Sequence, residues 1–319
     1  MCTALYRKDK NIYFGRNLDL DVNIKENVVI VPRNYPIHFK HHKTIHHHNA
    51  IIGVGQVINN YPLYYDAMNE YGLAIAGLNF PNNCKYFNPH KLKTNIASFE
   101  LILYLLMKYR NVNQIKKALH KINITNDDFL KNLSNSPLHF MVSDLNECIV
   151  IEQTKEGLKL YENTYNVLTN NPPFELQTKN LSKYKDLTNE FKNISSEIYF
   201  SNGLSLVGLP GDYSSMSRFV KAYYINLFTP ISKTNKESLI NYFNVLNSVS
   251  MPLGAVKTPN GYEITRYSDC YNLNEIKLYY KTNKSPLIHY VDIYEHDVNI
   301  KELIEIPFNY DFNDHFKRP

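Results

Sequence analysis

The sequence of 319 residues contains no tryptophan, only four cysteines and no apolar run long enough to cross a membrane. Lysine and arginine exceed the acidic residues by only five and are scattered, so the concentrated basic face of a nucleic-acid-binding protein is missing. The first fifteen residues carry charges throughout, which excludes the apolar core of a secretory signal. We therefore expect a cytoplasmic protein with no membrane span and no nucleic-acid partner.

The cysteines and histidines form no recognised metal-binding pattern. No two cysteines are separated by two residues, which removes the usual zinc and redox motifs. Histidines cluster in residues 38–48, but no cysteine or carboxylate pattern accompanies them, and we interpret this segment as a surface loop. The alternative, a His-rich metal-binding module, would require stoichiometric metal in the purified protein. We expect no metal and no cofactor.

Apolar residues, 44% of the chain, occur in blocks of short runs and in helical patterns. The short runs predict strands over 3–6, 11–14, 28–31, 51–54, 74–80, 138–142, 148–152, 158–161, 166–169, 262–266, 276–280 and 287–291. The helical patterns predict helices over 98–109, 112–122, 174–191, 214–228 and 236–246, the fourth with Ser214 as its N-cap.

These predicted strands come in groups, with helices between the groups. A parallel doubly wound sheet would need regular alternation of strands and helices, and that alternation is missing. We therefore predict an α+β fold in which helices cover antiparallel sheets. No repeat or low-complexity linker divides the chain, so we expect residues 1–319 to form one domain.

Cys2 is the residue with the clearest chemical meaning. Methionine aminopeptidases remove Met1 when the second residue is small, and cysteine qualifies. Removal would leave Cys2 with both its thiol and a free α-amine. The ordinary pKa of an α-amine is about 8, so this group can accept a proton near neutral pH. A nucleophile and its general base would then belong to one residue. On position alone, a small residue that merely begins a strand is the simpler interpretation.

Two charged residues follow the first pair of predicted strands. If these strands form a hairpin, Arg16 and Asp19 return to the side of Cys2. A guanidinium near the sulfur favours the thiolate by Coulomb attraction. A carboxylate near the α-amine would orient it and hold its proton. A surface ion pair at a strand end is the alternative.

Further polar groups follow later elements. Asn79 and Asn170 each end an apolar strand, where a side-chain amide or a backbone N–H would stabilise an oxyanion by roughly 3–4 kcal/mol. Arg218, on the predicted helix after the Gly-Leu-Pro-Gly turn, offers a second cation. Taken singly, the asparagines are typical turn residues, and the arginine is typical of a solvated helix surface.

Seven blocks of sequence occur in the order found in one enzyme family. They are Met1-Cys-Thr3, Phe14-Gly-Arg-Asn-Leu-Asp19, Asn60-Tyr-Pro-Leu-Tyr-Tyr-Asp-Ala-Met-Asn-Glu-Tyr-Gly-Leu73, Ala76-Gly-Leu-Asn-Phe80, Ser136-Pro-Leu-His-Phe-Met-Val-Ser-Asp144, Val167-Leu-Thr-Asn-Asn-Pro172 and Gly208-Leu-Pro-Gly-Asp-Tyr-Ser-Ser-Met-Ser-Arg-Phe219. From residue 1 to about residue 300 the chain resembles the choloylglycine hydrolases, the family of bile salt hydrolases and penicillin V acylases.

The resemblance implies a four-layer αββα fold of the N-terminal-nucleophile hydrolases, with two packed antiparallel sheets. It also implies an enzyme without metal or cofactor that assembles as a homotetramer. Cys2 would be the nucleophile and its α-amine the base. The other catalytic positions of the family fall on Arg16, Asp19, Asn79, Asn170 and Arg218.

The implied reaction is hydrolysis of the amide bond of a glycine- or taurine-conjugated bile salt. Penicillin-preferring members can carry tyrosine where Asn79 stands, and the Ala76–Phe80 block looks like the bile salt group. Penicillin V, an acyl-homoserine lactone, or a non-catalytic role in binding amphipathic ligands are the alternatives. Phe140 departs from the family, which often has tryptophan there. The apolar pocket positions, suited to a steroid face, would be Leu18, Ile58, Tyr65, Phe129 and Leu133.

Overall fold

The computed structural model describes residues 1–131, 133–190 and 205–310 of the chain. Within these residues one antiparallel sheet contains β1 (Cys2–Lys8), β2 (Ile12–Leu20), β12 (Val167–Leu168), β13 (Val256–Thr258), β14 (Gly261–Asn272), β15 (Lys277–Thr282) and β16 (His289–Asp292). The strand order is β12-β1-β2-β14-β15-β16, and β13 pairs with β14.

A second antiparallel sheet has eight strands among the described residues, in the order β11-β10-β9-β6-β5-β4-β3-β17. They are β3 (Asn27–Val31), β4 (Ile51–Ile58), β5 (Tyr61–Asn69), β6 (Ala74–Asn79), β9 (Leu138–Ser143), β10 (Cys148–Thr154), β11 (Gly157–Glu162) and β17 (Ile304–Pro307). A separate parallel pair is formed by β7 (Thr94–Ala97) and β8 (Ile122–Thr125).

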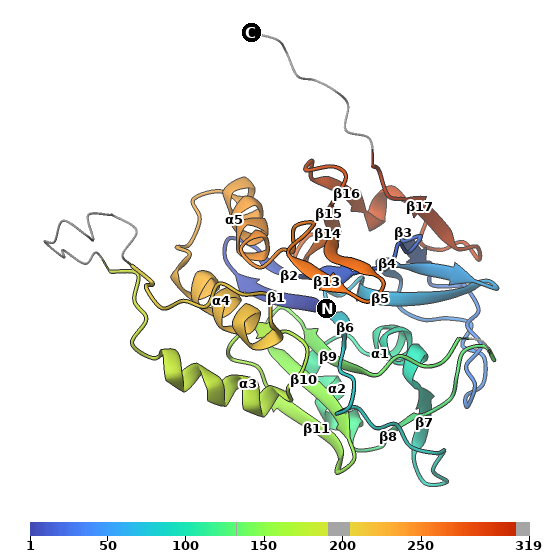
Figure 1. Ribbon diagram of the computed structural model, residues 1–319. Helices are drawn as coiled ribbons and strands as arrows, with labels where there is room; N and C mark the ends of the chain where they lie inside the picture. The colour runs from blue at the N-terminus through green and yellow to red at the C-terminus, as the bar shows by residue number, and fades with distance from the viewer. Residues whose placement is uncertain (132, 191–204, 311–319) are drawn as a thin grey trace, which may run out of the picture.

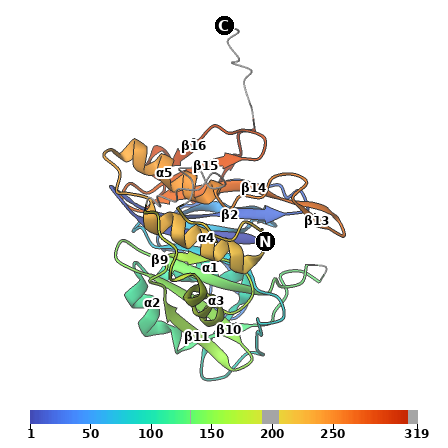
Figure 2. The ribbon, with the colours of Figure 1, turned by 60° about the vertical axis from the view of Figure 1, so that its left-hand side comes forward.

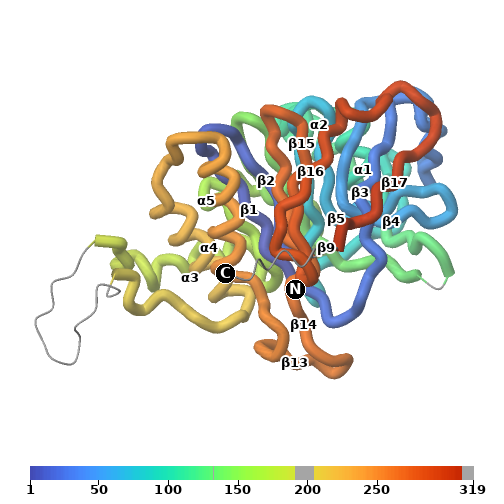
Figure 3. Tube along the Cα trace, turned by 90° about the horizontal axis from the view of Figure 1, so that it is seen from above, coloured from blue at the N-terminus to red at the C-terminus, as the bar shows by residue number. Residues whose placement is uncertain are grey.

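Helices cover the outer faces of the two sheets (Figures 1 and 2). The helices are α1 (Leu101–Lys108), α2 (Val112–Leu119), α3 (Phe174–Asn180), α4 (Ser215–Phe228) and α5 (Asn235–Asn247). Helices α4 and α5 pack on the seven-stranded sheet, while α1 and α2 share a core with the eight-stranded one. Seen from above, α3 to α5 gather at one end of the molecule and β3, β4, β5 and β17 at the other (Figure 3). The predicted α+β class and αββα layering are confirmed.

Alternation along the strands produces two separate cores. In β3, Val28 and Ile30 belong to the core between the two sheets, whereas Val29 and Val31 belong to the core beneath α1. Successive side chains of a strand point to opposite faces, so a strand in the middle of four layers must be apolar on both. This explains why the 28–31 run has no polar alternation.

Ser214 caps α4 as predicted, since its side chain accepts a hydrogen bond from the Ser217 N–H. The predicted helix over 174–191 is too long. It ends at Asn180 and continues only as a short 3₁₀ helix to Tyr184, and residue 191 lies outside the described residues. No residue of 182–190 is fully buried, and within this segment only Tyr184 and Leu187 pack against the core, which is too little apolar contact to support a longer helix.

Strand β5 was not predicted from the sequence. Its residues Tyr61–Asn69 include a proline, an aspartate and an asparagine, which interrupt the apolar pattern. Strand β14 is likewise longer than the predicted 262–266, because it continues through Ser268 and Asp269 to Asn272. These polar residues are buried in the structure, where partners from distant strands satisfy them, and short-range patterns do not reveal such partners.

Gly15 lies where β2 passes close to β14. A Cβ at this position would lie only 2.8 Å from the Asp269 carbonyl carbon, and that backbone belongs to a central strand. We expect Gly15→Ala to lower the free energy of unfolding by about 1–3 kcal/mol, because the two strands would have to separate. Urea denaturation checks this value.

Gly211→Ala is the matched control. Nothing lies within 4 Å of a Cβ built there, so its free energy of unfolding should stay within about 0.5 kcal/mol of wild type. Equal stability of both variants would contradict the close approach of β2 to β14.

Candidate active site

The hairpin of β1 and β2 brings three predicted site residues together. Its register pairs Cys2 with Leu18 and Ala4 with Arg16. Side chains two residues apart share a face, so Cys2 and Arg16 face the second sheet. Asp19 lies on the opposite face, toward α4. The hairpin itself follows from two adjacent β-rich runs joined by a short polar turn.

The Arg16 guanidinium holds the Cys2 sulfur from the space between the sheets. Its Nη2 donates to Sγ, and its Nη1 donates to the carbonyl oxygens of Gly77 (2.6 Å) and Tyr65 (3.2 Å). The side chain is 1% exposed. Burial opposes its charge, but the Cys2 sulfur and the nearby acids outweigh burial and raise the pKa of Arg16. A permanent cation therefore lies against the Cys2 sulfur.

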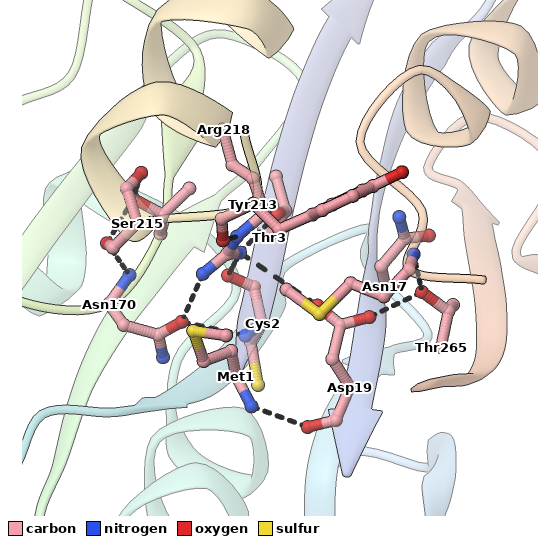
Figure 4. A network of polar contacts seen from close by, with 12 residues as sticks. Met1, Cys2, Thr3, Asn17, Asp19, Asn170, Tyr213, Ser215, Arg218 and Thr265 are labelled. Carbon is pink, nitrogen blue, oxygen red and sulfur yellow. Dashed lines mark hydrogen bonds and ion pairs between the residues drawn. The ribbon is translucent and has the colours of Figure 1, made fainter. Parts of the chain in front are cut away.

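Arg218 approaches Cys2 from α4, on the other face of the hairpin (Figure 4). Its Nη1 donates to the Cys2 carbonyl oxygen (2.5 Å) and to Thr3 Oγ1 (2.7 Å). Its Nη2 donates to Asn170 Oδ1 (2.9 Å). Burial lowers the pKa of Arg218, and the neighbouring Asp19 and Cys2 counter this effect. Arg218 thus fixes the backbone of the nucleophile rather than its sulfur.

Asp19 is fully buried beside Arg218. Its Oδ2 lies 3.9 Å from Arg218 Nη1, and its Oδ1 accepts a hydrogen bond from Thr265 Oγ1 (2.5 Å) on β14. Burial raises the pKa of the Asp19 carboxyl, while Arg218 and the Thr265 hydroxyl oppose the rise. The carboxyl is therefore held rigidly near the start of the chain.

The Asn170 side chain connects Cys2 and Arg218 with the end of β6. Its Oδ1 accepts from the Cys2 backbone nitrogen (2.8 Å), and its Nδ2 donates to the Asn79 carbonyl oxygen (2.8 Å). An amide nitrogen carries two hydrogens, so the second remains for an oxygen of a substrate. Its main-chain N–H donates to Ser215 Oγ (2.8 Å) at the start of α4.

Asn79 contacts the site through its backbone, because its carbonyl oxygen accepts the hydrogen bond from Asn170 Nδ2, while the residue itself is exposed. The next residue, Phe80, donates its N–H to Pro137 on the β9 side. Alternate residues of a strand direct their backbone groups to opposite sides. The carbonyl oxygens of Gly77 and Asn79 therefore face Arg16 and Asn170, and the Asn79 N–H faces the same way.

Met1 covers this site in the full chain. Its amino group donates to the Asp19 carbonyl oxygen (2.6 Å) and forms an ion pair with Glu263. Burial lowers the pKa of this amine. The Cys2 nitrogen is a peptide nitrogen while Met1 is present, and removal of Met1 would turn it into an amine already hydrogen-bonded to Asn170.

Two acids lie behind Arg16. Asp66 accepts hydrogen bonds from the hydroxyls of Tyr267 (2.8 Å) and Tyr271 (2.6 Å), and its Oδ2 lies 3.8 Å from Arg16 Nη1. Asp269 Oδ1 accepts from the Arg16 N–H (2.6 Å). Burial, and then the charge of Asp66, raise the pKa of Asp269 well above its ordinary value.

This arrangement predicts how stability changes with pH. In the unfolded chain Asp269 ionises near its ordinary pKa of about 3.9, whereas in the fold it stays protonated to much higher pH. Its contribution to stability is therefore full below pH ~4 and declines as the pH rises toward the folded pKa. Asp269→Asn cannot ionise and still offers an acceptor oxygen to Arg16.

We expect the melting temperature of Asp269→Asn, relative to wild type, to rise between pH 5 and pH 8 by about 2 °C per pH unit. Thermal unfolding in matched buffers measures this difference. A difference that does not change with pH would contradict a protonated Asp269.

An apolar cavity of about 340 Å³ shares one residue, Tyr65, with the contacts of Arg16. Four of the five predicted pocket residues line it, namely Ile58, Tyr65, Phe129 and Leu133. The Tyr65 carbonyl oxygen accepts from Arg16, so the cavity wall lies one residue from the Cys2 sulfur. Leu18, the fifth, is not among the cavity's lining residues and lies buried opposite Cys2 on the hairpin.

The 38–48 loop lies mostly at the surface. His41 pairs with Asp127 (2.6 Å), and the His48 ring lies against backbone carbonyl oxygens. Among the residues described here, no group of three or more His, Cys, Asp or Glu side chains is arranged to hold a metal ion. No helix in the described ranges is long and apolar enough to cross a membrane.

Several residues that contact the site were not found from the sequence as site residues. Thr3 and Tyr213 accept from Arg218, and Thr265 holds Asp19. Asp66 and Asp269 lie behind Arg16. Thr3, Asp66 and Tyr213 lie inside three of the seven family blocks, which offered a signal. For Thr265 and Asp269, contacts across more than 200 residues depend on strand register and leave no local signal.

The geometry fits a class of protein, the hydrolases with a cysteine nucleophile: the Cys2 sulfur is held by a buried arginine, and the Cys2 nitrogen would become a free amine if Met1 were removed. The family model for linear amide C–N hydrolases of the choloylglycine hydrolase family matches residues 2–306. A bile salt hydrolase/transferase from Lactiplantibacillus plantarum is 43% identical over 313 residues, 96% of this chain and 97% of the relative. The chain therefore belongs to the choloylglycine hydrolase family.

Solved structures agree with this assignment. A crystal structure of a variant of the conjugated bile acid hydrolase from Clostridium perfringens superposes with a TM-score of 0.92 at 31% identity, covering 99% of this chain and 100% of that one. Penicillin V acylase from Agrobacterium tumefaciens shares the fold, with a TM-score of 0.76 at 18% identity over 96% of this chain and 90% of its own. The chain is thus a hydrolase of linear amide C–N bonds.

Proposed function

We propose that the enzyme hydrolyses the amide bond of glycine- or taurine-conjugated bile salts. The observation that carries this proposal is the position of the Cys2 sulfur, held by a buried arginine beside an apolar cavity. The relatives described above are named for hydrolysis of bile salts and conjugated bile acids. An amphipathic amide suits such a site, because its apolar body fills the cavity while its amide meets the sulfur.

In the first step the Cys2 thiolate attacks the amide carbonyl carbon, after the thiol proton has passed to the α-amine. The carbonyl oxygen becomes an oxyanion, and we assign its stabilisation to Asn170 Nδ2 and the Asn79 backbone N–H. Preorganised donors of this kind contribute roughly 3–4 kcal/mol each. Collapse of this intermediate breaks the C–N bond, and the α-ammonium protonates the leaving nitrogen.

An acyl-thioester on Cys2 remains after the amino acid leaves. The α-amine, again neutral, takes a proton from water, and the resulting hydroxide attacks the thioester carbonyl carbon. The C–S bond then breaks, the free bile acid leaves and the thiolate is restored. Arg16 would stabilise the sulfur anion, while Asp19 and Arg218 would hold the N-terminal residue in position.

We propose one domain over residues 1–319, a cytoplasmic location, no cofactor and assembly as a homotetramer. Penicillin V or an acyl-homoserine lactone would use the same steps with a different acyl group, and an assay with these substrates separates the cases.

Replacement of the nucleophile tests the mechanism. We expect Cys2→Ala to lower kcat on glycocholate and taurocholate at least roughly 10⁴-fold, because no other group forms the thioester. Release of glycine or taurine is the measurement, on protein whose Met1 removal has been established by mass spectrometry. Cys84→Ala removes a half-buried thiol outside the site and should retain activity within about twofold. Undiminished turnover by Cys2→Ala would sink the scheme.

Truncation of the pocket tests the substrate. Phe129 packs against Phe99 (5.2 Å between ring centroids) and lines the cavity. We expect Phe129→Ala to raise KM for glycocholate about tenfold with kcat nearly unchanged, because apolar contact area is lost. Leu92→Ala, at a side chain that is 90% exposed, is the control and should change neither constant. An unchanged KM in Phe129→Ala would move the substrate out of this cavity.

A further inference from the structure

A buried histidine lies directly behind the Asn170 loop. His139 on β9 is fully buried, and its Nε2 lies 2.7 Å from the Thr169 carbonyl oxygen. Its Nδ1 lies 3.1 Å from Glu152 Oε1 on β10. The Phe80 ring stacks on the imidazole, with 4.2 Å between centroids and 4° between planes. None of the mechanistic steps above uses this histidine.

The partners determine where the hydrogens lie. A carbonyl oxygen can only accept, so Nε2 of His139 carries a hydrogen and donates it to Thr169. Glu152 Oε1 also accepts from the Phe174 N–H (2.9 Å), and a second proton lies between Oε1 and Nδ1. The pair is net neutral as a unit, which limits the cost of burying it. Both ring nitrogens are engaged, so the ring has one orientation.

The hydrogen bond to Thr169 acts on the main chain of Asn170. The Thr169 carbonyl and the Asn170 N–H belong to one planar peptide unit. His139 binds the oxygen of this unit, and Ser215 Oγ accepts from its N–H (2.8 Å). The Thr169 hydroxyl donates to Gln177 Oε1 (2.8 Å) on α3. The peptide plane is thus fixed at both edges, and the direction of the Asn170 side chain follows from it.

We propose that His139 is a positioning residue for Asn170. By fixing the Thr169–Asn170 peptide, it aims Asn170 Nδ2 at the oxyanion, and Glu152 fixes the ring that does so. The inference rests on the proposed role of Asn170. Because a misplacement of about 1 Å can cost roughly 10²-fold in rate, loss of this hydrogen bond should lower kcat while the apolar cavity, and hence KM, stays nearly unchanged.

Two amide replacements separate the functions of the two ring nitrogens. His139→Gln places an amide nitrogen near Nε2 and can still donate to Thr169. His139→Asn places one near Nδ1, reaches only Glu152, and leaves the Thr169 oxygen without its donor. We expect kcat for glycine release from glycocholate to stay within about threefold of wild type in His139→Gln. In His139→Asn it should fall about 10- to 100-fold, with KM within about twofold.

Alkylation of Cys2 by iodoacetamide provides a second readout, because this reaction needs the thiolate but no oxyanion donor. We expect His139→Asn to be alkylated within about twofold of the wild-type rate. His48→Asn is the matched control, since His48 is also buried with both ring nitrogens against carbonyl oxygens, but of Asn49 and Tyr35. It should keep kcat, even if its melting temperature falls.

Three results would overturn the proposal: equal kcat in the Gln and Asn variants, a fall in alkylation that matches the fall in kcat, or an equal loss of kcat in His48→Asn. If His139→Asn does not fold, a loss of more than tenfold in His139→Gln would also overturn it. Failure of the proposed function is recognised separately, because wild type would then not release glycine, or Asn170→Ala would keep wild-type kcat.

Discussion

The Arg16 guanidinium lies between two sheets with almost none of its surface exposed, and the arrangement around Cys2 depends on it. A buried cation is strongly destabilising unless it is paired and hydrogen-bonded. Here backbone carbonyl oxygens of β5 and β6, the Cys2 sulfur and Asp66 supply the partners. The hydrogen bonds that satisfy the Arg16 charge therefore connect the two sheets with the start of the chain. The same charge lies directly against the sulfur of the proposed nucleophile.

Strand alternation divides the site between two faces of one hairpin. Cys2 and Arg16 face the second sheet, whereas Thr3 and Asp19 face α4 and its Arg218. The inner face controls the sulfur, and the outer face holds the backbone of the N-terminal residue. In the proposed mechanism one residue is both nucleophile and base, and it would need both functions, since the thiol and the amine must be oriented independently.

The donors assigned to the oxyanion come from segments that packed elements hold in place. Asn79 ends β6, and Asn170 follows β12 of the other sheet, linked by a hydrogen bond from Asn170 Nδ2 to the Asn79 carbonyl oxygen. His139, Ser215 and the Arg218 guanidinium restrain Asn170 from three directions. In the proposed mechanism such restraint would orient the donors before the charge develops, which is how electrostatic stabilisation of a transition state becomes effective.

The sequence by itself determined the hairpin that carries Cys2, Arg16 and Asp19, the fold class and the family, because periodicity, turn residues and ordered motifs are local properties. Only the tertiary structure decided that Asn79 offers its backbone rather than its side chain, since that depends on the register with β9. The same holds for β5, whose buried Asp66 is satisfied by hydroxyls some 200 residues away. A polar residue is predicted to lie at the surface unless the hydrogen-bond partner that satisfies it in the core is known. That partner is determined by the packing of distant strands rather than by the neighbouring sequence.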